Sequence, residues 1–293
     1  MSALIGIDWG TSNLRAFRFA AAGEVAERRA SPRGITMVPG GTFEAVLHDI
    51  VGDWIVPDTR IVMAGMIGSR GGWVEAPYLP CPADPAALAA ALIRVPTALA
   101  PCFVVPGLSS GPDQPADVMR GEETQIAGAG ITDGVIALLG THGKWARLEA
   151  GRVTAFRTAM TGELFRLLVD HSMLGKLMAP QATPDDEGAF ARGVRRSIAE
   201  PSLAATLFSA RAEVLLGRMA PTEVKAYLSG LLIGAEVATL AHGRGPVTLV
   251  GDPALNARYH TALTLAGAGP IGLVDGETAV AAGIWQIAKE ARP

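Results

Sequence analysis

Apolar and polar positions form short runs and alternating stretches at the start of the chain. They predict a strand that ends at Asp8, an alternating strand through Phe19 and a third strand that ends near Arg29. Turn residues separate the three strands, at Gly10-Thr11 and at Gly23. This spacing predicts an antiparallel meander.

A helix and further strands are predicted next. Apolar residues recur at helical spacing over 43–54, and the apolar run at 61–64 is typical of a buried strand. A second helix over 85–93 and a strand over 102–105 extend the sheet, and Pro and Gly residues then interrupt the pattern. The order is strand, strand, strand, helix, strand, and we expect this first domain to cover residues 1–116.

The second half begins with the same plan. A helix from Gly121 leads to an apolar strand at 135–139 and a Gly140-Thr141 turn. Strands at 144–148 and 152–158 follow, with a Gly turn between them. Helices are then expected at 162–174, 186–199 and 222–242. A strand at 247–250 and a last helix from 276 follow.

The two halves share a motif at the same place. G-T-S-N-L-R-A at 10–16 and G-T-H-G-K-W-A at 140–146 each join a buried strand to a second strand. Literal identity between them is low, but their matching positions indicate two copies of one α/β unit. The sequence therefore predicts a second domain at 117–293 that faces the first across a cleft.

Composition and charge narrow the function. Hydrophobic residues make up 49% of the chain and charged residues 18%, which excludes a disordered protein. The net charge of −3 without a basic run gives no reason to expect a nucleic-acid or membrane partner. The longest apolar stretches are broken by Glu236, Arg258 and Pro270, so no membrane segment is expected. Two cysteines and the absence of a signal-peptide pattern predict a cytoplasmic protein.

The loop after the first strand is a candidate Mg²⁺ and phosphate site. Asp8 ends the strand, and Mg²⁺ favours one or two carboxylates together with phosphate oxygens. The Gly10 turn exposes amides and hydroxyls, and Thr11, Ser12 and Asn13 have groups that donate hydrogen bonds to phosphate. A plain hairpin with an Asx turn explains the same residues, and the second copy of the motif favours the site.

The corresponding loop in the second half lacks a carboxylate. Gly140, Thr141, His142 and Lys144 offer backbone amides and a cation, which suit the terminal phosphates of a nucleotide. The alternative is a tight hairpin whose lysine points to water.

Two adjacent carboxylates follow a glycine between these loops. Glu122 and Glu123 come directly after Gly121 at a predicted helix start, and a general base there would accept a hydroxyl proton during phosphoryl transfer. Neighbouring helical residues point about 100° apart, so we expect only one to face the substrate. Acidic residues are also favoured in any first helical turn by the helix dipole.

Two features near the C-terminus complete the pattern. Gly251 lies in a turn between a strand and a helix that starts at Pro253, where a flat adenine would fit. The last helix is crowded with small residues over 279–288. Such residues permit a close helix crossing that would mark a hinge, or they reflect ordinary helix packing, and the sequence leaves both open.

These segments in this order resemble the sugar kinase, actin and heat-shock chaperone superfamily. A narrower resemblance is to the 2-dehydro-3-deoxygalactonokinase family. It rests on five motifs: I-G-I-D-W-G-T-S-N-L-R at 5–15, M-A-G-M-I-G-S-R at 63–70, M-R-G-E-E-T-Q at 119–125, G-T-H-G-K-W at 140–145 and M-T-G-E-L-F at 160–165. One departure is Gly143, where relatives often carry another small or hydroxyl residue. Another is Glu122, where many related carbohydrate kinases carry Asp.

The resemblance implies two ribonuclease-H-like domains of βββαβα type and an ATP- and Mg²⁺-dependent kinase. Its substrate would be 2-dehydro-3-deoxy-D-galactonate, phosphorylated at the terminal hydroxyl. Glu122 is the base that related carbohydrate kinases suggest, with Glu123 as the alternative. Arg33, Arg70 and Arg120 are candidates for the substrate carboxylate, and each is equally explained as a solvated surface arginine. Arg70 ranks first only because it lies in a Gly-rich loop.

Other members of these families leave alternatives. The first alternative is a kinase for another 2-keto-3-deoxy sugar acid. The second is an enzyme that hydrolyses ATP without an acceptor, and the third is an ATP-driven binding protein. The sequence leaves the oligomeric state open, with a homodimer among the expectations.

Overall fold

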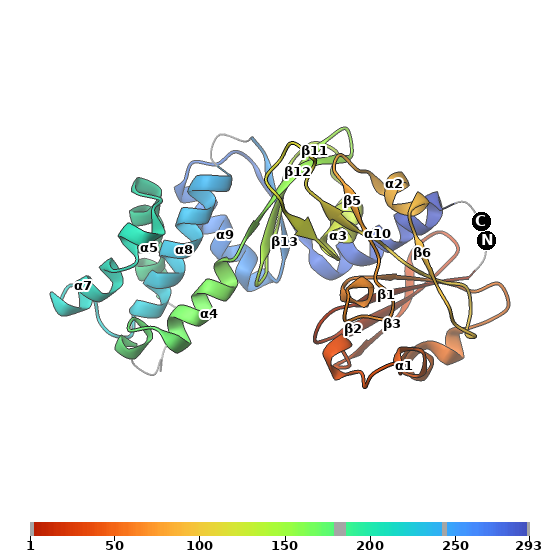
Figure 1. The fold of residues 1–293 in the computed structure, drawn as a ribbon. Coiled ribbons are helices and arrows are strands. Elements are labelled where there is room, and N and C mark those ends of the chain that lie inside the picture. Colours follow the sequence, from red (N-terminus) through yellow and green to blue (C-terminus); the bar gives the residue numbers. More distant parts are fainter. Residues whose placement is uncertain (1–2, 179–185, 242–244, 292–293) are drawn as a thin grey trace. The chain divides into compact units, whose positions relative to one another are not determined.

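A computed structural model describes residues 3–178, 186–241 and 245–291 of the chain (Figure 1). By the density of contacts it divides into two compact units. Unit 1 comprises residues 1–133, 147–156 and 274–293, and unit 2 comprises 134–146 and 157–273. The sequence-based boundary between residues 116 and 117 stays a prediction, as does the cleft between two domains.

Unit 1 contains a six-stranded sheet in the order β3-β2-β1-β4-β7-β6. β1 pairs antiparallel with β2, which confirms the predicted meander, and parallel with β4, the buried strand expected at 61–64. The elements of this unit are β1 (Leu4–Trp9), β2 (Leu14–Phe19), β3 (Val25–Ser31), α1 (Phe43–Val51), β4 (Arg60–Ala64), β5 (Tyr78–Pro80), α2 (Pro85–Ala90), β6 (Ile93–Val95), β7 (Cys102–Val104), β8 (Gly107–Ser109), β9 (Val118–Met119), α3 (Glu122–Gly128) and α10 (Gly276–Glu290).

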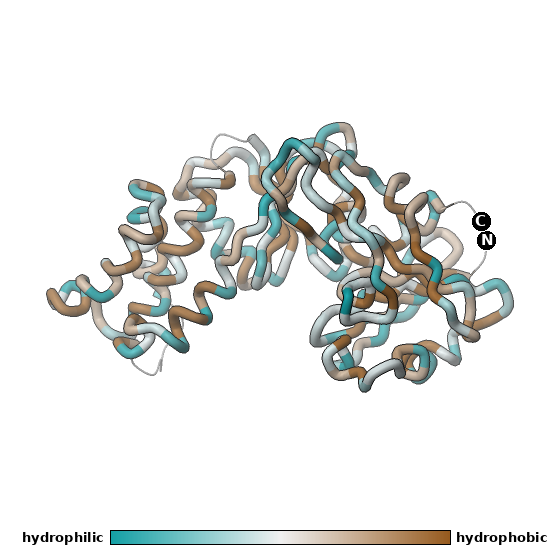
Figure 2. The backbone as a smooth tube through the Cα atoms, viewed as in Figure 1, coloured by the Kyte–Doolittle hydropathy of each residue, from teal (hydrophilic) through white to brown (hydrophobic). Residues whose placement is uncertain are grey.

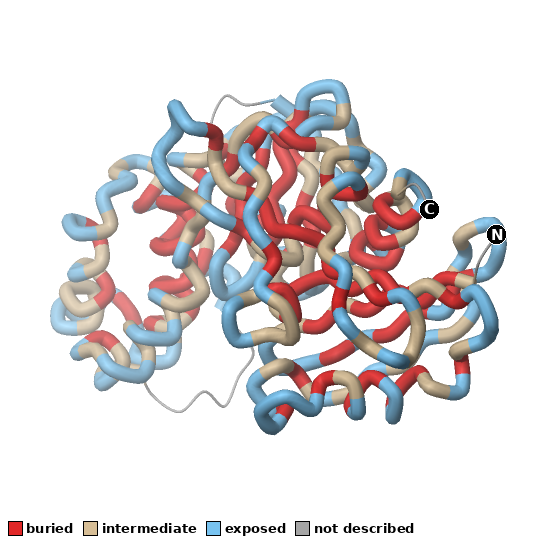
Figure 3. The backbone as a smooth tube through the Cα atoms, turned by 45° about the vertical axis from the view of Figure 1, so that its right-hand side comes forward, coloured by how far each residue is buried: buried red, intermediate tan, exposed pale blue. Residues whose placement is uncertain are grey.

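Burial follows position in this sheet. The central strands β1 and β4 are buried almost continuously, whereas the edge strand β3 alternates between half-buried and exposed residues. Phe43, Leu47 and Trp54 from α1 and the turn after it pack into the same core as Ile7 and Met63. Figure 3 shows buried segments in red along the inner strands. The carboxyl ends of β1 and β4 are thus held rigidly by a packed core.

A second sheet has the order β12-β11-β10-β13-β14. Its first four strands repeat the order of β3-β2-β1-β4, and β10 pairs parallel with β13 as β1 does with β4. This confirms the α/β fold of two ribonuclease-H-like sheets. The strands are β10 (Gly134–Leu138), β11 (Gly143–Glu149), β12 (Arg152–Ala159), β13 (Val247–Gly251) and β14 (Ile271–Asp275).

The helices of unit 2 pack around α8, which is buried along most of its length. Its brown colour in Figure 2 reflects a sequence that is apolar on all sides. No helix in the described part of the chain is long and apolar enough to cross a membrane. The helices are α4 (Thr161–His171), α5 (Glu187–Ala199), α6 (Leu203–Thr206), α7 (Ser209–Leu215), α8 (Val224–Leu240) and α9 (Pro253–Leu265).

Some predicted bounds were wrong. The helix expected over 85–93 ends at Ala90, because Ile93–Val95 joins the sheet edge as β6 beside β7. The short elements β5, β8, β9, β14, α6 and α7 were not predicted, since segments this short show too few positions to reveal a period. The helix expected over 222–242 spans 224–240, and His242 lies outside the described residues.

Small residues bring α3 and α10 into close contact within unit 1. A Cβ atom on Gly283 would lie 1.8 Å from the Thr124 carbonyl oxygen. One on Gly128 would lie 2.0 Å from the carbonyl oxygen of Ala279. The structure therefore shows the close helix crossing that the small residues permit, and the hinge stays a prediction.

Because backbone cannot yield as a flexible side chain does, Gly283→Ala should lower the free energy of unfolding by about 3 kcal/mol or more. Gly40→Ala is the control, since a Cβ there meets no atom within 4 Å. Urea denaturation of both variants measures the difference. Equal stability of Gly283→Ala and the parent would contradict so close a crossing.

Candidate active site

The loop after β1 is fixed through its backbone. The Gly10 amide donates to the Asn13 carbonyl over 2.9 Å. The carbonyls of Gly10, Thr11 and Ser12 accept from amides of residues 34–36 at 3.0 to 3.3 Å. Thr11, Ser12 and Asn13 are exposed. The loop therefore has a set shape and presents its polar side chains to solvent.

Asp8 lies at the start of this loop and is only 19% exposed. Arg15 donates to it over 3.2 Å and also lies 3.7 Å from Glu277. Burial raises the pKa of Asp8, and the Arg15 guanidinium opposes that rise. The described residues hold no cluster of three or more metal-ligating side chains. A single carboxylate suits Mg²⁺ that arrives with phosphate and water ligands, so Asp8 fits this ion.

Two glycines bring the start of α3 to the end of β1. A Cβ on Gly65, directly after β4, would lie 3.4 Å from Asp8 Oδ1 and 2.9 Å from the Trp9 carbonyl oxygen. A Cβ on Gly121 would lie 3.3 Å from Gly65 Cα. Both glycines have positive φ, 92° and 102°. Gly65 therefore lies close to both Asp8 at the end of β1 and Gly121 at the start of α3. Glu122 is the next residue after Gly121 in the chain.

The paired carboxylates differ in surroundings. Glu122 is partly exposed, and its Oε2 accepts from the Arg120 amide over 3.0 Å. Glu123 is 1% exposed and accepts from the Gly121 amide over 2.7 Å and from the Thr124 hydroxyl over 3.0 Å. Burial, with the nearby charge of Glu122, raises the pKa of Glu123 to about 8. Glu123 also lines a hollow of about 330 Å³ to which Glu122 does not contribute. The Glu122 and Glu123 side chains therefore point in different directions, as their adjacent positions at the start of a helix predicted.

The three candidate arginines also differ. Arg70 is 91% exposed and lies 3.9 Å from Glu75, and Arg33 pairs with Asp49 over 3.1 Å. Arg120 turns inward: its Nη2 donates to the Ala76 carbonyl over 2.7 Å.

The rest of the Arg120 guanidinium is enclosed. It lies 4.4 Å from the centre of the Tyr78 ring, and a Cβ on Gly68 would come within 2.9 Å of its Nη1. Its Nε and Nη1 are buried and make no hydrogen bond to any residue that the structure describes. Arg120 therefore has two buried N–H groups without a hydrogen-bond partner, whereas the guanidiniums of Arg33 and Arg70 are exposed beside a carboxylate.

The loop in unit 2 is held by α4. The Glu163 amide donates to the Thr141 carbonyl over 3.1 Å, and the Glu163 carboxylate pairs with His142. Lys144 is 5% exposed, and its Nζ donates to the His142 carbonyl over 3.1 Å. A lysine that points to water is therefore excluded, and the Lys144 cation lies within the loop.

Gly251, expected in a turn, is the last residue of β13, and Asp252 joins it to α9. The Asp252 side chain caps this helix by accepting from the Ala254 amide over 2.9 Å. Asn256 donates to the Gly251 carbonyl over 3.3 Å, while its Oδ1 is buried without a hydrogen bond to the described residues. The start of α9 is thus well fixed, and the buried Asn256 Oδ1 beside it has no partner among the described residues.

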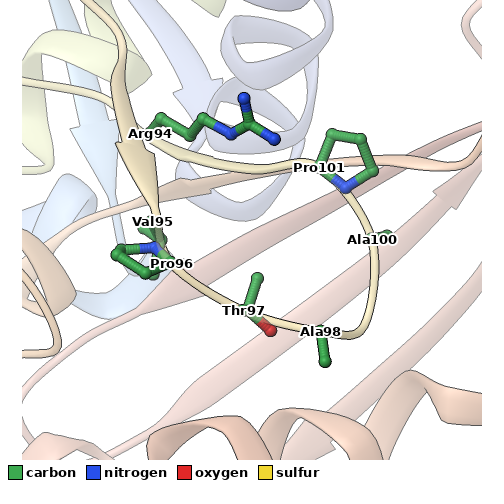
Figure 4. A pocket seen from close by; sticks show the side chains of 7 residues that line it. All are labelled: Arg94, Val95, Pro96, Thr97, Ala98, Ala100 and Pro101. Carbon is green, nitrogen blue, oxygen red and sulfur yellow. The ribbon is translucent and has the colours of Figure 1, made fainter.

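A separate hollow of about 530 Å³ lies at the loop between β6 and β7 (Figure 4). Arg94 is its only ionisable lining residue, and none of the predicted site residues reaches it. The remaining lining residues are Val95, Pro96, Thr97, Ala98, Ala100 and Pro101. It lacks the groups that phosphoryl transfer needs.

Sequence reasoning missed several residues of the site. Gly65 and Glu163 lie within two quoted motifs, M-A-G-M-I-G-S-R and M-T-G-E-L-F, to which no role had been given. Arg15 lies in the first loop motif, and its pairing with Asp8 follows from their facing positions in β1 and β2. The motifs were the available signal, but only the fold shows what each residue touches.

Known proteins resemble this chain over nearly its whole length. A profile of the 2-keto-3-deoxy-galactonokinase family matches residues 8–287. The 2-dehydro-3-deoxygalactonokinase of Escherichia coli K12 is 40% identical over 290 residues, 97% of each chain. A Rhizobium meliloti protein with the same family name is 37% identical and covers 98% of this chain and 97% of its own.

A solved structure agrees. A family protein from Sinorhizobium meliloti has a TM-score of 0.90 at 36% identity, covering 99% of both chains. Together with the family profile and the Escherichia coli relative, this likeness shows that the chain belongs to the 2-dehydro-3-deoxygalactonokinase family of sugar-acid kinases.

Proposed function

We propose that this protein transfers the γ-phosphoryl group of ATP to the terminal 6-hydroxyl of 2-dehydro-3-deoxy-D-galactonate. Its products would be the 6-phosphate and ADP, formed in galactonate catabolism in the cytoplasm. The observation that carries this proposal is the Asp8–Gly65–Gly121 contact, which brings a metal-binding carboxylate beside the helix that begins with Glu122. Membership of the family supports the choice of sugar acid.

The proposed roles follow the geometry. Asp8 holds Mg²⁺, which when bound neutralises phosphate charge, and the side chains of Thr11, Ser12 and Asn13 donate to phosphate oxygens. The amides of Gly140 and Thr141, with His142 and Lys144, bind the terminal phosphates. Gly251 lies against the adenine. The ligands are small molecules, and assembly as a homodimer remains part of the proposal.

Glu122 is the proposed base. It follows Gly121 directly and is partly exposed, so a substrate hydroxyl can reach it. Glu123 is enclosed, has both oxygens occupied and is mostly protonated at neutral pH because its pKa is about 8. A neutral, buried acid is a poor proton acceptor for a substrate.

Arg120 replaces Arg70 as the first candidate for the substrate carboxylate. A cation with two unsatisfied buried donors gains more from a carboxylate than one already in water. Because Nε and Nη1 are shielded, the carboxylate would reach them only when the 65–76 loop opens.

A coupled ADP-release assay over a panel of 2-keto-3-deoxy sugar acids tests the activity. ADP formation should depend on the acceptor and be fastest with 2-dehydro-3-deoxy-D-galactonate. Steady ADP formation without any acceptor would instead indicate an ATP hydrolase. A faster rate with another sugar acid would reassign the substrate and keep the reaction.

Glu122→Gln should lower kcat by about 10²–10⁴-fold with little change in the KM for ATP, because it keeps the shape but cannot accept the proton. Steady-state kinetics at saturating sugar acid measures this. An unchanged kcat would remove Glu122 from the chemistry.

Glu123→Gln is the matched control. It resembles the protonated acid, so turnover should stay near the parent value. The pH dependence of its stability should change instead. A raised pKa means that the folded parent loses stability, by up to about 5 kcal/mol, as pH rises from about 4.5 to about 8, and the variant should not. A fast Glu122→Gln beside an inactive Glu123→Gln would transfer the role to Glu123.

Arg120→Lys should raise the KM for the sugar acid about tenfold or more while the KM for ATP changes little, because lysine keeps the charge but lacks the planar fork. Arg70→Lys is the matched control and should leave both KM values near those of the parent. The reverse outcome would return the carboxylate to Arg70. If both variants behaved like the parent, Arg33 would become the candidate.

A further inference from the structure

One carboxylate lies deep in unit 2 and has no part in the proposed chemistry. Glu236 is the only acidic residue of α8, and it is 6% exposed among the apolar residues of that helix. Burying a carboxylate costs free energy unless hydrogen bonds compensate. A hydrophobic residue would fill this position at a smaller cost in free energy, so the contacts of Glu236 call for an explanation.

Both of its oxygens accept hydrogen bonds from other elements. Oε1 accepts from the Trp145 indole over 2.6 Å, and Oε2 accepts from the Tyr259 hydroxyl over 2.7 Å. The Thr161 side chain is a further hydrogen-bond partner. Glu236 therefore joins α8 to the start of β11, the start of α4 and the middle of α9.

Two of these partners, Trp145 and Thr161, border the 140–144 loop of the proposed nucleotide site. Trp145 follows Lys144 directly, and a Cβ on Gly143 would lie 3.5 Å from Glu236 Oε1. Thr161 precedes Gly162, whose Cβ would lie 2.7 Å from the Gly140 carbonyl oxygen. The 140–144 loop is thus supported on both sides by residues that Glu236 holds.

Tyr259 extends the support to the other loop. It lies in α9, the helix that Asp252 caps directly after Gly251. Its ring centre lies 6.4 Å from that of Trp145. One carboxylate therefore fixes the 140–144 loop and the helix that follows Gly251 to the same point of α8.

We propose that Glu236 is a positioning residue for ATP: it holds the 140–144 loop and α9 in the arrangement that binds the nucleotide. This inference rests on the proposed function, since it takes those loops as the nucleotide site. Loop amides bind phosphate well only when they are held in place beforehand, because ordering them on binding would cost affinity. Loss of the network should therefore weaken nucleotide binding more than sugar-acid binding.

Calorimetric titration of Mg²⁺-ADP without the sugar acid tests the proposal on the full chain. Trp145→Phe keeps an aromatic ring in the core, with a small cavity, and removes the donor to Oε1; we expect its Kd for ADP to rise roughly tenfold. Glu236→Ala should weaken ADP at least as much. Glu236→Gln should restore near-parent affinity, because its amide oxygen still accepts from the indole and its amide nitrogen can donate to the Tyr259 oxygen.

Ser229→Ala is the control for loss of a different hydrogen bond between α8 and α9, since Ser229 is another buried polar residue of α8 and accepts from Arg258 of α9 over 2.8 Å without Glu236. It should lower stability without changing the Kd for ADP. If Glu236→Ala does not fold, Trp145→Phe decides the question.

A parent-like Kd for ADP in Trp145→Phe would overturn the proposal, as would equal weakening in Ser229→Ala. Failure of the parent itself to bind ADP would instead count against the proposed function. The KM for the sugar acid should change less than the KM for ATP in Trp145→Phe, which a general loss of stability would not produce.

Discussion

The absence of side chains at Gly65 and Gly121 is the constraint on which the rest of the candidate site depends. A Cβ on Gly65 would press on the Trp9 carbonyl at 2.9 Å, and both glycines have a backbone conformation that other residues rarely adopt. Any larger residue would move α3 away from the end of β1. Asp8 and Glu122 would then separate, even though neither had changed.

Each unit has a buried acid close to its loop, but the two are satisfied differently. Glu123 bonds to its own helix start, at Gly121 and Thr124, and so stabilises α3 locally. Glu236 bonds to Trp145 and Tyr259, which lie far from it in sequence. A fully satisfied buried polar group specifies one arrangement of its neighbours, because any other arrangement leaves it without partners. We infer that each of these acids holds the loop beside it in one defined arrangement.

Burial distinguishes the three candidate arginines, which the sequence alone does not. Arg33, Arg70 and Arg120 are equivalent as residue types, and a Gly-rich loop favours Arg70 when only the sequence is considered. In the fold, Arg70 is exposed beside Glu75, whereas Gly68 and Tyr78 enclose Arg120. Water already satisfies the first guanidinium, and only a ligand or a loop movement can satisfy the second.

The sequence by itself determined the order of the elements, the duplicated plan and the family, because these depend on local periodicity and on motifs that are contiguous in the chain. It also identified both loops and the Glu122-Glu123 pair. Only the tertiary structure decided that Glu123 is the buried one, that Lys144 turns into its loop and that Glu236, which the sequence presents merely as a break in an apolar stretch, accepts from two other elements. Those properties depend on which distant segments pack together, and no local pattern records such contacts.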